Sequence, residues 1–312
     1  MRKVYFRADA GVAIGYGHFI RSLALADMLK DDFNCIFFTC HPTPYQVSEM
    51  EKVCSFITLQ EETHYGKFLS YLQGDEIVVL DNYFFDTGYQ RKIKAKGCKL
   101  VCIDDMHDKY YVADIVVNHS LLRKPKSFLK ETYTKLCLGE QYALLRKPFI
   151  SNHNLTIKRN DNIVVCIGGS DPLHIIDKIV DIILERFPDK LIHVIVGDAV
   201  KTKYERHCSV TLHRGIPAEE VAGLFCKSGL AIVSASSVLL EAYFCGIPVM
   251  VGWLADNQKE IYEYIEKNDL FVTIGYLPEL SAEKIKKEAN LNNNKISDCN
   301  IKNNYLTLFK SL

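Results

Sequence analysis

The sequence predicts an α/β protein of two domains, each built on an open parallel sheet. The chain has 312 residues, which is more than one hydrophobic core usually supports, so two domains of about 150 residues each are expected. Short runs rich in Val and Ile alternate with longer segments of helical period, a pattern typical of repeated βαβ units. The pattern breaks once, near residue 151, and then starts again.

In the first half, the apolar runs expected to form strands are each followed by polar or turn residues. A helix is expected from about Gly17 to Lys30, because its apolar residues recur with a helical period and form one wide face. The expected strands are Val4–Arg7, Cys35–Thr39, Ile77–Leu80, Leu100–Ile103 and Ile115–Val117.

Polar residues dominate positions 151–162, as in a linker, so the first domain is expected to cover residues 1–150 and the second 151–312. The last helix, Ile301–Leu312, is expected to pack back on the first domain. The expected strands of the second half are Ile163–Ile167, Ile192–Val196, Leu230–Val233 and Pro248–Val251. Its expected helices are Pro172–Phe187, Pro217–Cys226, Ser237–Cys245 and Gln258–Asn268.

The composition argues against several classes of function. Lys plus Arg and Asp plus Glu both number 38, so there is no basic excess to bind a nucleic acid backbone. No apolar run reaches the roughly 18 residues of a membrane span, and the charged start is unlike a signal peptide, so a cytoplasmic location is expected. The protein is also expected to be a monomer. The 11 cysteines contain no Cys-x-x-Cys pair, and neither a metal nor a cofactor is expected.

Two open parallel sheets are expected to face each other across a cleft, with ligands bound beyond the carboxyl ends of the strands. In the first half, Gly15-Tyr16-Gly17-His18 follows a strand and opens a helix. The glycines permit a tight turn, and the helix dipole keeps a histidine in the first turn neutral, which is the state of a general base. The alternative is a common turn in which His18 only packs or caps. Ile20 breaks the Gly-x-Gly-x-x-Gly pattern of dinucleotide sites.

In the second half, Gly168-Gly169-Ser170-Asp171-Pro172 also follows a strand. With Asp171 as the N-cap and Pro172 as the first helical residue, Gly168 to Ser170 would present backbone N–H groups to a diphosphate at a helix N-terminus. Ser236 and Ser237 open the next helix and can donate to phosphate, while Glu241, one turn in, can accept both ribose hydroxyls. Plain turn chemistry, helix capping and a solvated glutamate are the alternatives.

Three further turns place polar side chains at strand ends. Asp256-Asn257-Gln258 opens a helix and can contact sugar or phosphate, although an ordinary N-cap would have the same sequence. Asp81-Asn82-Tyr83 and Asp104-Asp105 end strands of the first half. They are candidates for binding substrate hydroxyls, with simple strand termination as the alternative.

These turns together resemble the glycosyltransferase-B fold, and more narrowly the UDP-sugar hydrolases of pseudaminic acid biosynthesis. The first stretch of the resemblance, Phe6–Asp9 with Ile14–His18 and Arg21, is the most specific. The others are Gly139 with Tyr142–Arg146 and Phe149, and Gly168–Asp171 with Ser234–Ser237, Glu241, Asn257 and Gln258.

The resemblance implies a UDP-linked diacetamido-trideoxyhexose as substrate, UDP-2,4-diacetamido-2,4,6-trideoxy-β-L-altropyranose in the family. Water would attack its anomeric carbon with inversion and with His18 as general base. The Gly168–Ser170 turn and both serines would hold the diphosphate, Glu241 the ribose, and Asn257 would face the sugar. Arg7 or Arg21 would stabilise the leaving diphosphate without a metal. The remaining expected substrate contacts are Gly15, Gly17, Asp9, Tyr83 and Gln258.

Two other functions fit the same pattern. A glycosyltransferase of this fold would use the same UDP-sugar site with an acceptor hydroxyl in place of water. A nucleotide-sugar sensor without activity would keep Glu241 and the Gly168 turn, but it would have no need for His18.

Overall fold

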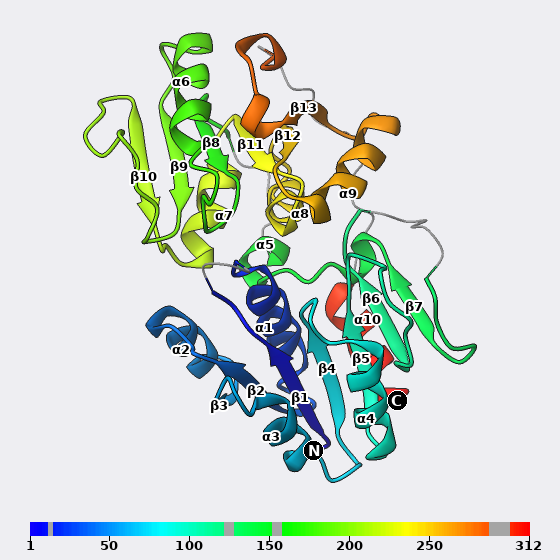
Figure 1. Ribbon diagram of the computed structural model, residues 1–312. Coiled ribbons are helices and arrows are strands. Elements are labelled where there is room, and N and C mark those ends of the chain that lie inside the picture. The colour runs from blue at the N-terminus through cyan, green and yellow to red at the C-terminus, as the bar shows by residue number, and fades with distance from the viewer. Residues whose placement is uncertain (12–14, 122–127, 152–157, 287–299) are drawn as a thin grey trace. The chain divides into compact units, whose positions relative to one another are not determined.

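The computed structural model describes residues 1–11, 15–121, 128–151, 158–286 and 300–312 (Figure 1). Ile14, residues 152–157 of the expected linker and the Asn-rich segment 291–294 lie outside the described residues. The chain divides into two compact units. Unit 1 contains residues 1–146 and the C-terminal helix, and unit 2 begins at Lys147. Within the described part of the chain, no helix combines the length and the apolar character that a membrane span requires.

Unit 1 is built on a seven-stranded sheet in the order β3-β2-β1-β4-β5-β6-β7, with every pairing parallel. The five strands expected from the sequence are confirmed. The edge strands β3 and β7 were not expected, because they are short and only partly buried and so lack a continuous apolar run. The bounds are β1 Lys3–Ala8, β2 Asn34–Cys40, β3 Ser55–Leu59, β4 Ile77–Asp81, β5 Lys99–Ile103, β6 Ile115–Asn118 and β7 Lys135–Leu138.

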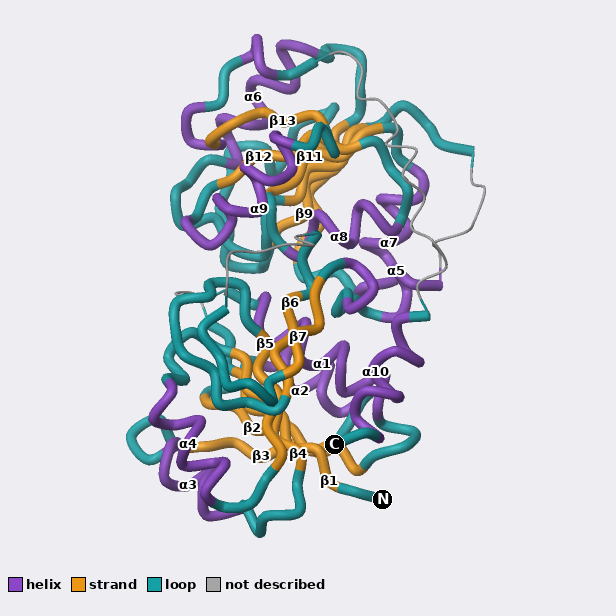
Figure 2. Tube along the Cα trace, turned by 90° about the vertical axis from the view of Figure 1, so that its right-hand side faces the viewer, coloured by secondary structure: helices purple, strands orange, loops and turns teal. Residues whose placement is uncertain are grey.

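Helices cover both faces of this sheet (Figure 2). α1 (Gly17–Leu29) and α10 (Ile301–Lys310) lie on one face, and α3 (His64–Tyr71) and α4 (Thr87–Ala95) on the other. α2 (Pro44–Glu51) follows β2 and begins with a capping box formed by Thr43. The layers bury the strands on both faces, which explains why they are continuous apolar runs and not alternating patterns.

The C-terminal helix α10 packs on α1, inside unit 1. The hydroxyl of Tyr305 donates a hydrogen bond of 2.6 Å to the carbonyl of Tyr142, in the short 3-10 helix η1 (Glu140–Tyr142). The ring of Phe309 lies 6.1 Å from that of Phe33, centre to centre. The assignment of the last residues to the second domain is therefore corrected, and the helix packs on the first domain as expected of its apolar face.

Unit 2 is built on a six-stranded parallel sheet in the order β10-β9-β8-β11-β12-β13. The edge strands β10 and β13 were not expected, again because they are only partly buried. The strands are β8 Ile163–Cys166, β9 Ile192–Val196, β10 Val210–Arg214, β11 Leu230–Ser234, β12 Val249–Trp253 and β13 Val272–Tyr276. The helices are α5 Lys147–Ser151, α6 Ile176–Arg186, α7 Ala218–Lys227, α8 Ser237–Phe244 and α9 Asp256–Lys267, with 3-10 turns η2 Leu277–Glu279 and η3 Ala282–Lys284.

The short helix α5 moves the domain boundary from residue 150 to residue 146. It contacts α7 and α8, so it belongs to unit 2 although it precedes the polar linker. Phe149 is fully buried, and burying a phenylalanine side chain contributes about 2–3 kcal/mol of folding free energy. This packing explains why the five residues belong to unit 2.

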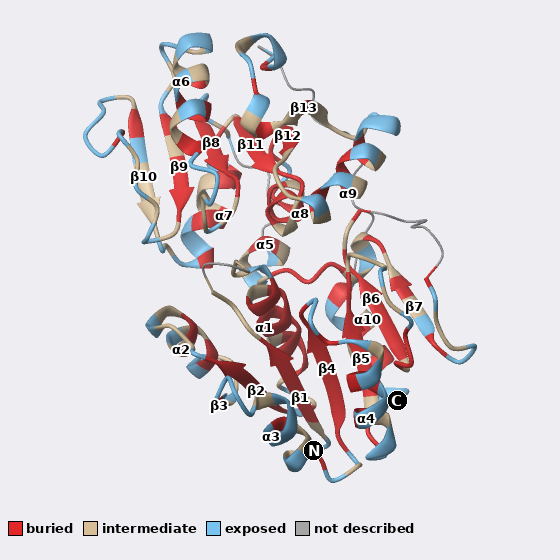
Figure 3. Ribbon diagram, in the orientation of Figure 1, coloured by how far each residue is buried: buried red, intermediate tan, exposed pale blue. Residues whose placement is uncertain are grey.

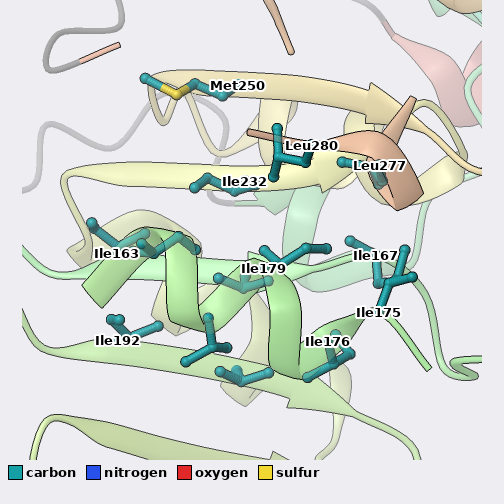
Figure 4. Close-up of a cluster of buried hydrophobic side chains, with 14 of the residues drawn as sticks. Ile163, Ile167, Ile175, Ile176, Ile179, Ile192, Ile232, Met250, Leu277 and Leu280 are labelled. Carbon is teal, nitrogen blue, oxygen red and sulfur yellow. The ribbon is translucent and has the colours of Figure 1, made fainter. Parts of the chain in front are cut away.

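The core of each unit lies between sheet and helices, where the central strands are almost wholly buried (Figure 3). Figure 4 shows the cluster of unit 2, in which Ile179 of α6 packs with Ile163, Ile192 and Ile232 of three strands. Helix α6 turns Ile176, Ile179, Val180 and Ile183 toward the sheet, at helical spacing. This core fixes the strands, and the strands fix the turns that follow them.

Candidate functional site

In unit 1 the candidate site lies where the strand order reverses, between β1 and β4. The chain leaves β1 toward one side of the sheet and β4 toward the other, and such switch points are the usual ligand sites of open α/β sheets. Gly15 has a φ of +72°, and its N–H donates 2.7 Å to the carbonyl of Gly11. Helix α1 then begins at Gly17, so His18 is its second residue.

His18 is buried and paired with Asp81, the last residue of β4. Its Nδ1 lies 2.7 Å from Oδ1 of Asp81. A carboxylate only accepts hydrogen bonds, so Nδ1 is the donor of this pair, and in the neutral ring Nε2 is the nitrogen that can accept a proton. The ring of His18 thus forms a specific pair with a carboxylate from another strand, and its role as general base stays a prediction.

Asp81 is not available for substrate hydroxyls, since donors occupy both of its oxygens. Arg21 donates from Nε (2.7 Å) and Nη2 (2.6 Å), and Ser22 donates from Oγ (3.0 Å). Burial raises the pKa of Asp81, but the charge of Arg21 and the hydrogen bonds from Arg21 and His18 outweigh it and hold that pKa well below its usual range. Asp81 is therefore ionised and orients His18. The sequence placed Asp81 at a strand end but did not reveal this partner.

Arg21 supports this pair from inside unit 1. Besides its bonds to Asp81, its Nη1 donates 2.9 Å to Oδ2 of Asp105 and lies 3.4 Å from Nε2 of His119. All three guanidinium nitrogens thus have partners, and the side chain is only 6% exposed. The expected direct contact of Arg21 with the diphosphate is replaced by a supporting role.

Arg7 and Asp9 brace the ends of β1 and β2. Arg7 has no exposed surface, donates to Asp9 (2.5 Å), and lies 2.9 Å from Nδ1 of His64. Burial and the charge of Arg7 lower the pKa of His64, so its neutral ring accepts from Arg7. Asp9 also accepts from the N–H of Cys40 (2.7 Å). Because its guanidinium is fully buried, Arg7 has a structural role at the end of β1 in this structure, and its contact with the diphosphate stays a prediction.

Tyr83 lies beside His18 in the turn after β4. The two rings meet edge to face with 4.6 Å between their centres. Tyr83 is 38% exposed, so its ring combines contact with the candidate base and surface open to a ligand.

In unit 2 the strand order reverses between β8 and β11, and the expected phosphate turns follow these two neighbouring strands. Ser234, the last residue of β11, donates 3.0 Å to the carbonyl of Ile167 after β8, and its Oγ lies 2.9 Å from Oγ of Ser236. Gly168 has a φ of +127°, which side chains rarely tolerate. The structure thus brings the Gly168–Ser170 turn and the start of α8 together.

Helix α6 begins at Ile176 and not at Pro172. The carboxylate of Asp171 accepts from the N–H groups of Ile175 (2.9 Å) and Ile176 (3.1 Å), so it caps the helix from outside its first turn. The expected helix N-terminus directly behind Gly168–Ser170 is therefore wrong. The turn is held instead by Gly197, whose N–H donates 3.1 Å to the carbonyl of Gly169.

Glu241 lies on α8 and is only 7% exposed, so the alternative of a solvated helix glutamate is wrong. Ser236 is the N-cap residue of α8 without a side-chain capping bond, and Ser237 follows it, half-buried. Gln258 is buried, and its Oε1 accepts from the N–H of Leu254 (3.1 Å), which gives it a structural role at the start of α9. Asn257, next to it, is partly exposed.

Cation ligands do not gather in either unit as far as the chain is described: no group of three or more His, Cys, Asp or Glu side chains is placed to hold a metal ion.

The fold matches that of several solved structures over nearly the whole chain. MurG of Acinetobacter baumannii superimposes with a TM-score of 0.58 at 12% identity, covering 99% of this chain and 91% of its own. A UDP-GlcNAc 2-epimerase of Methanocaldococcus jannaschii gives a TM-score of 0.60 at 11% identity, covering 99% and 100%. The chain has the glycosyltransferase-B fold. The predicted α/β class with two Rossmann-like units is confirmed, and the cleft between them stays a prediction.

Curated relatives extend the comparison to sequence, although no protein-family model matches the chain. The UDP-2,4-diacetamido-2,4,6-trideoxy-β-L-altropyranose hydrolase of Campylobacter jejuni is a homologue, 25% identical over 88% of this chain and 100% of its own length. An uncharacterized protein of M. jannaschii is 28% identical over 85% of this chain, which spans 58% of that relative. The spore coat polysaccharide biosynthesis protein SpsG of Bacillus subtilis is 25% identical, covering 80% and 77%. These comparisons support the prediction that this protein is an enzyme.

Proposed function

We propose that this protein hydrolyses a UDP-sugar at the anomeric carbon and releases free sugar and UDP. The observation that carries the proposal is the buried His18–Asp81 pair at the switch point of β1 and β4, which leaves Nε2 of His18 as a proton acceptor. The homologous hydrolase of C. jejuni supports the same reaction and suggests a diacetamido-trideoxyhexose as the sugar. Its substrate name and the spore coat relative suggest surface polysaccharide biosynthesis, in the pseudaminic acid route.

In the proposed reaction, Nε2 of His18 takes a proton from water while the water oxygen forms a bond to the anomeric carbon. The bond between that carbon and the diphosphate oxygen breaks, and its electron pair leaves with UDP. The attack comes from the face opposite the leaving group, so the configuration inverts. Asp81 keeps the ring oriented and stabilises the imidazolium that forms.

Unit 2 is proposed to hold the UDP. The Gly168–Ser170 turn, with Ser236 and Ser237, supplies N–H and hydroxyl donors for the diphosphate. The buried carboxylate of Glu241 accepts from the ribose hydroxyls, and Asn257 contacts the sugar. We do not assign Arg7 and Arg21 to this binding, because their guanidinium groups form hydrogen bonds within unit 1.

The test is hydrolysis of a panel of UDP-sugars in ¹⁸O-labelled water, followed by mass spectrometry of both products. Label in the sugar is expected, since water then attacks the anomeric carbon. Label in UDP would mean attack at phosphorus and would contradict the proposal.

The His18→Ala variant tests the base. It should keep less than about a tenth of wild-type turnover, a barrier increase of at least roughly 1.4 kcal/mol, and should bind UDP as the wild type does. Turnover above that level would show that His18 is not the base.

A glycosyltransferase is the second candidate, favoured by the fold that the chain shares with MurG. It would transfer the sugar to an acceptor hydroxyl. Steady release of free sugar in the absence of any acceptor supports hydrolysis, whereas turnover that starts only when an acceptor is added supports transfer.

A further inference from the structure

Arg21 joins two carboxylates that come from the ends of neighbouring strands. It binds Asp81, at the end of β4, through two nitrogens, and Asp105, after β5, through the third at 2.9 Å. The side chain of Asp105 is 23% exposed, and it has no direct hydrogen bond to His18 among the described residues. Asp105 therefore acts on the candidate base only through Arg21 and through its charge.

The charges around His18 do not cancel. The groups facing it are Asp81 on β4, Arg21 on its own helix, Asp105 after β5, His119 after β6 and the neutral phenol of Tyr83. Burial and then Arg21 lower the pKa of His119 to about 3, so that ring is uncharged. Burial raises the pKa of Asp105, but the charge and the hydrogen bond of Arg21 outweigh it and lower that pKa, so Asp105 is ionised.

Asp81 and Arg21 neutralise each other, which leaves the carboxylate of Asp105 as the uncompensated charge of the cluster. When His18 takes a proton, the cluster passes from one net negative charge to none. In a poorly solvated site such a counter-charge stabilises the imidazolium strongly. Without Asp105 the same step would create a net positive charge in the interior of unit 1.

We propose that Asp105 is a positioning residue for the reaction: it holds Arg21 against the Asp81–His18 pair and supplies the negative charge that lets His18 accept a proton. This inference rests on the proposed function of His18. It assigns to the second aspartate of Asp104-Asp105 a role other than binding substrate hydroxyls.

The Asp105→Asn variant tests the charge with little change of shape, because the amide oxygen can still accept from Arg21. The acid limb of the kcat/KM profile should move to lower pH by about one unit, because the variant lacks the negative charge that stabilises the imidazolium. A less basic His18 should also lower kcat roughly threefold, with KM unchanged. The Asp105→Glu variant keeps the charge and should restore the wild-type acid limb.

Asp86→Asn is the matched control. The carboxylate of Asp86 caps α4 by accepting from the N–H of Tyr89 (2.7 Å), and asparagine caps a helix equally well. It should leave the pH profile and kcat unchanged. The proposal is overturned if the Asp105→Asn enzyme keeps the wild-type acid limb. It is also overturned if Asp105→Glu loses as much kcat as Asp105→Asn does.

Protonation of His18 can also be followed without turnover, by NMR of the imidazole carbon-bound protons, with His18→Gln to assign the signal. If no UDP-sugar is hydrolysed, the proposed function fails. The inference about Asp105 still stands or falls separately on whether the His18 midpoint shifts in Asp105→Asn.

Discussion

Gly197 follows β9 and lies against the turn proposed to bind the diphosphate, so a methyl group at this position tests that turn. The Cβ of an alanine at position 197 would lie 2.2 Å from the carbonyl oxygen of Gly169, a backbone atom. Real Cβ contacts stay above 3.0 Å, so Gly169 must move by at least about 0.8 Å or the turn must open. The hydrogen bond of 3.1 Å from Gly197 to Gly169 would be strained or lost.

The expected result of Gly197→Ala is a fall in UDP affinity of roughly tenfold to a hundredfold, because a displacement of this size misplaces donors that must meet the phosphates within tenths of an ångström. The free energy of unfolding should fall by about 1–3 kcal/mol, the usual cost of overpacking. Titration calorimetry with UDP and urea unfolding measure the two effects.

Gly223→Ala is the control. Gly223 lies in α7, and no atom lies within 4 Å of the Cβ that it would carry. Alanine there should raise stability by about 0.5–1 kcal/mol and leave UDP binding unchanged. A folded Gly197→Ala protein that binds UDP as tightly as Gly223→Ala would refute the placement of the diphosphate at Gly168–Ser170.

Three further predictions concern other parts of the structure. Asp81→Asn should lower kcat at least about a hundredfold with UDP binding intact. Because the pKa of Asp81 is depressed, its ion pair stabilises the wild type above about pH 4, and this stabilisation is lost as the pH falls further. Urea unfolding at acid pH should therefore show a smaller loss of unfolding free energy in the variant than in the wild type. The wild type should bind UDP more tightly than 2′-deoxy-UDP, and Glu241→Gln should abolish that preference. Tyr305→Phe removes the hydroxyl bond to Tyr142 and should cost about 1 kcal/mol in urea unfolding.

The sequence predicted the architecture well where the strands are central. Runs such as Ile77–Leu80 and Ile163–Ile167 lie in the middle of a sheet and are buried on both faces, so their composition alone identifies them. The edge strands β3 and β10 face solvent on part of their surface and carry no such signal. Local turn chemistry also misplaced the start of α6, since Asp171 caps that helix from several residues before it.

The sequence by itself determined the fold class and the turns that follow the strands, because apolar periodicity and glycine are local properties of the chain. Only the tertiary structure decided which of those turns meet and which charges have partners. Strand order brings Asp81, 63 residues away in sequence, to His18. It also places Arg7 and Arg21 where their guanidinium groups form hydrogen bonds inside unit 1. Burial makes these contacts decisive, since a charge inside a protein must be paired and its partner sets its pKa.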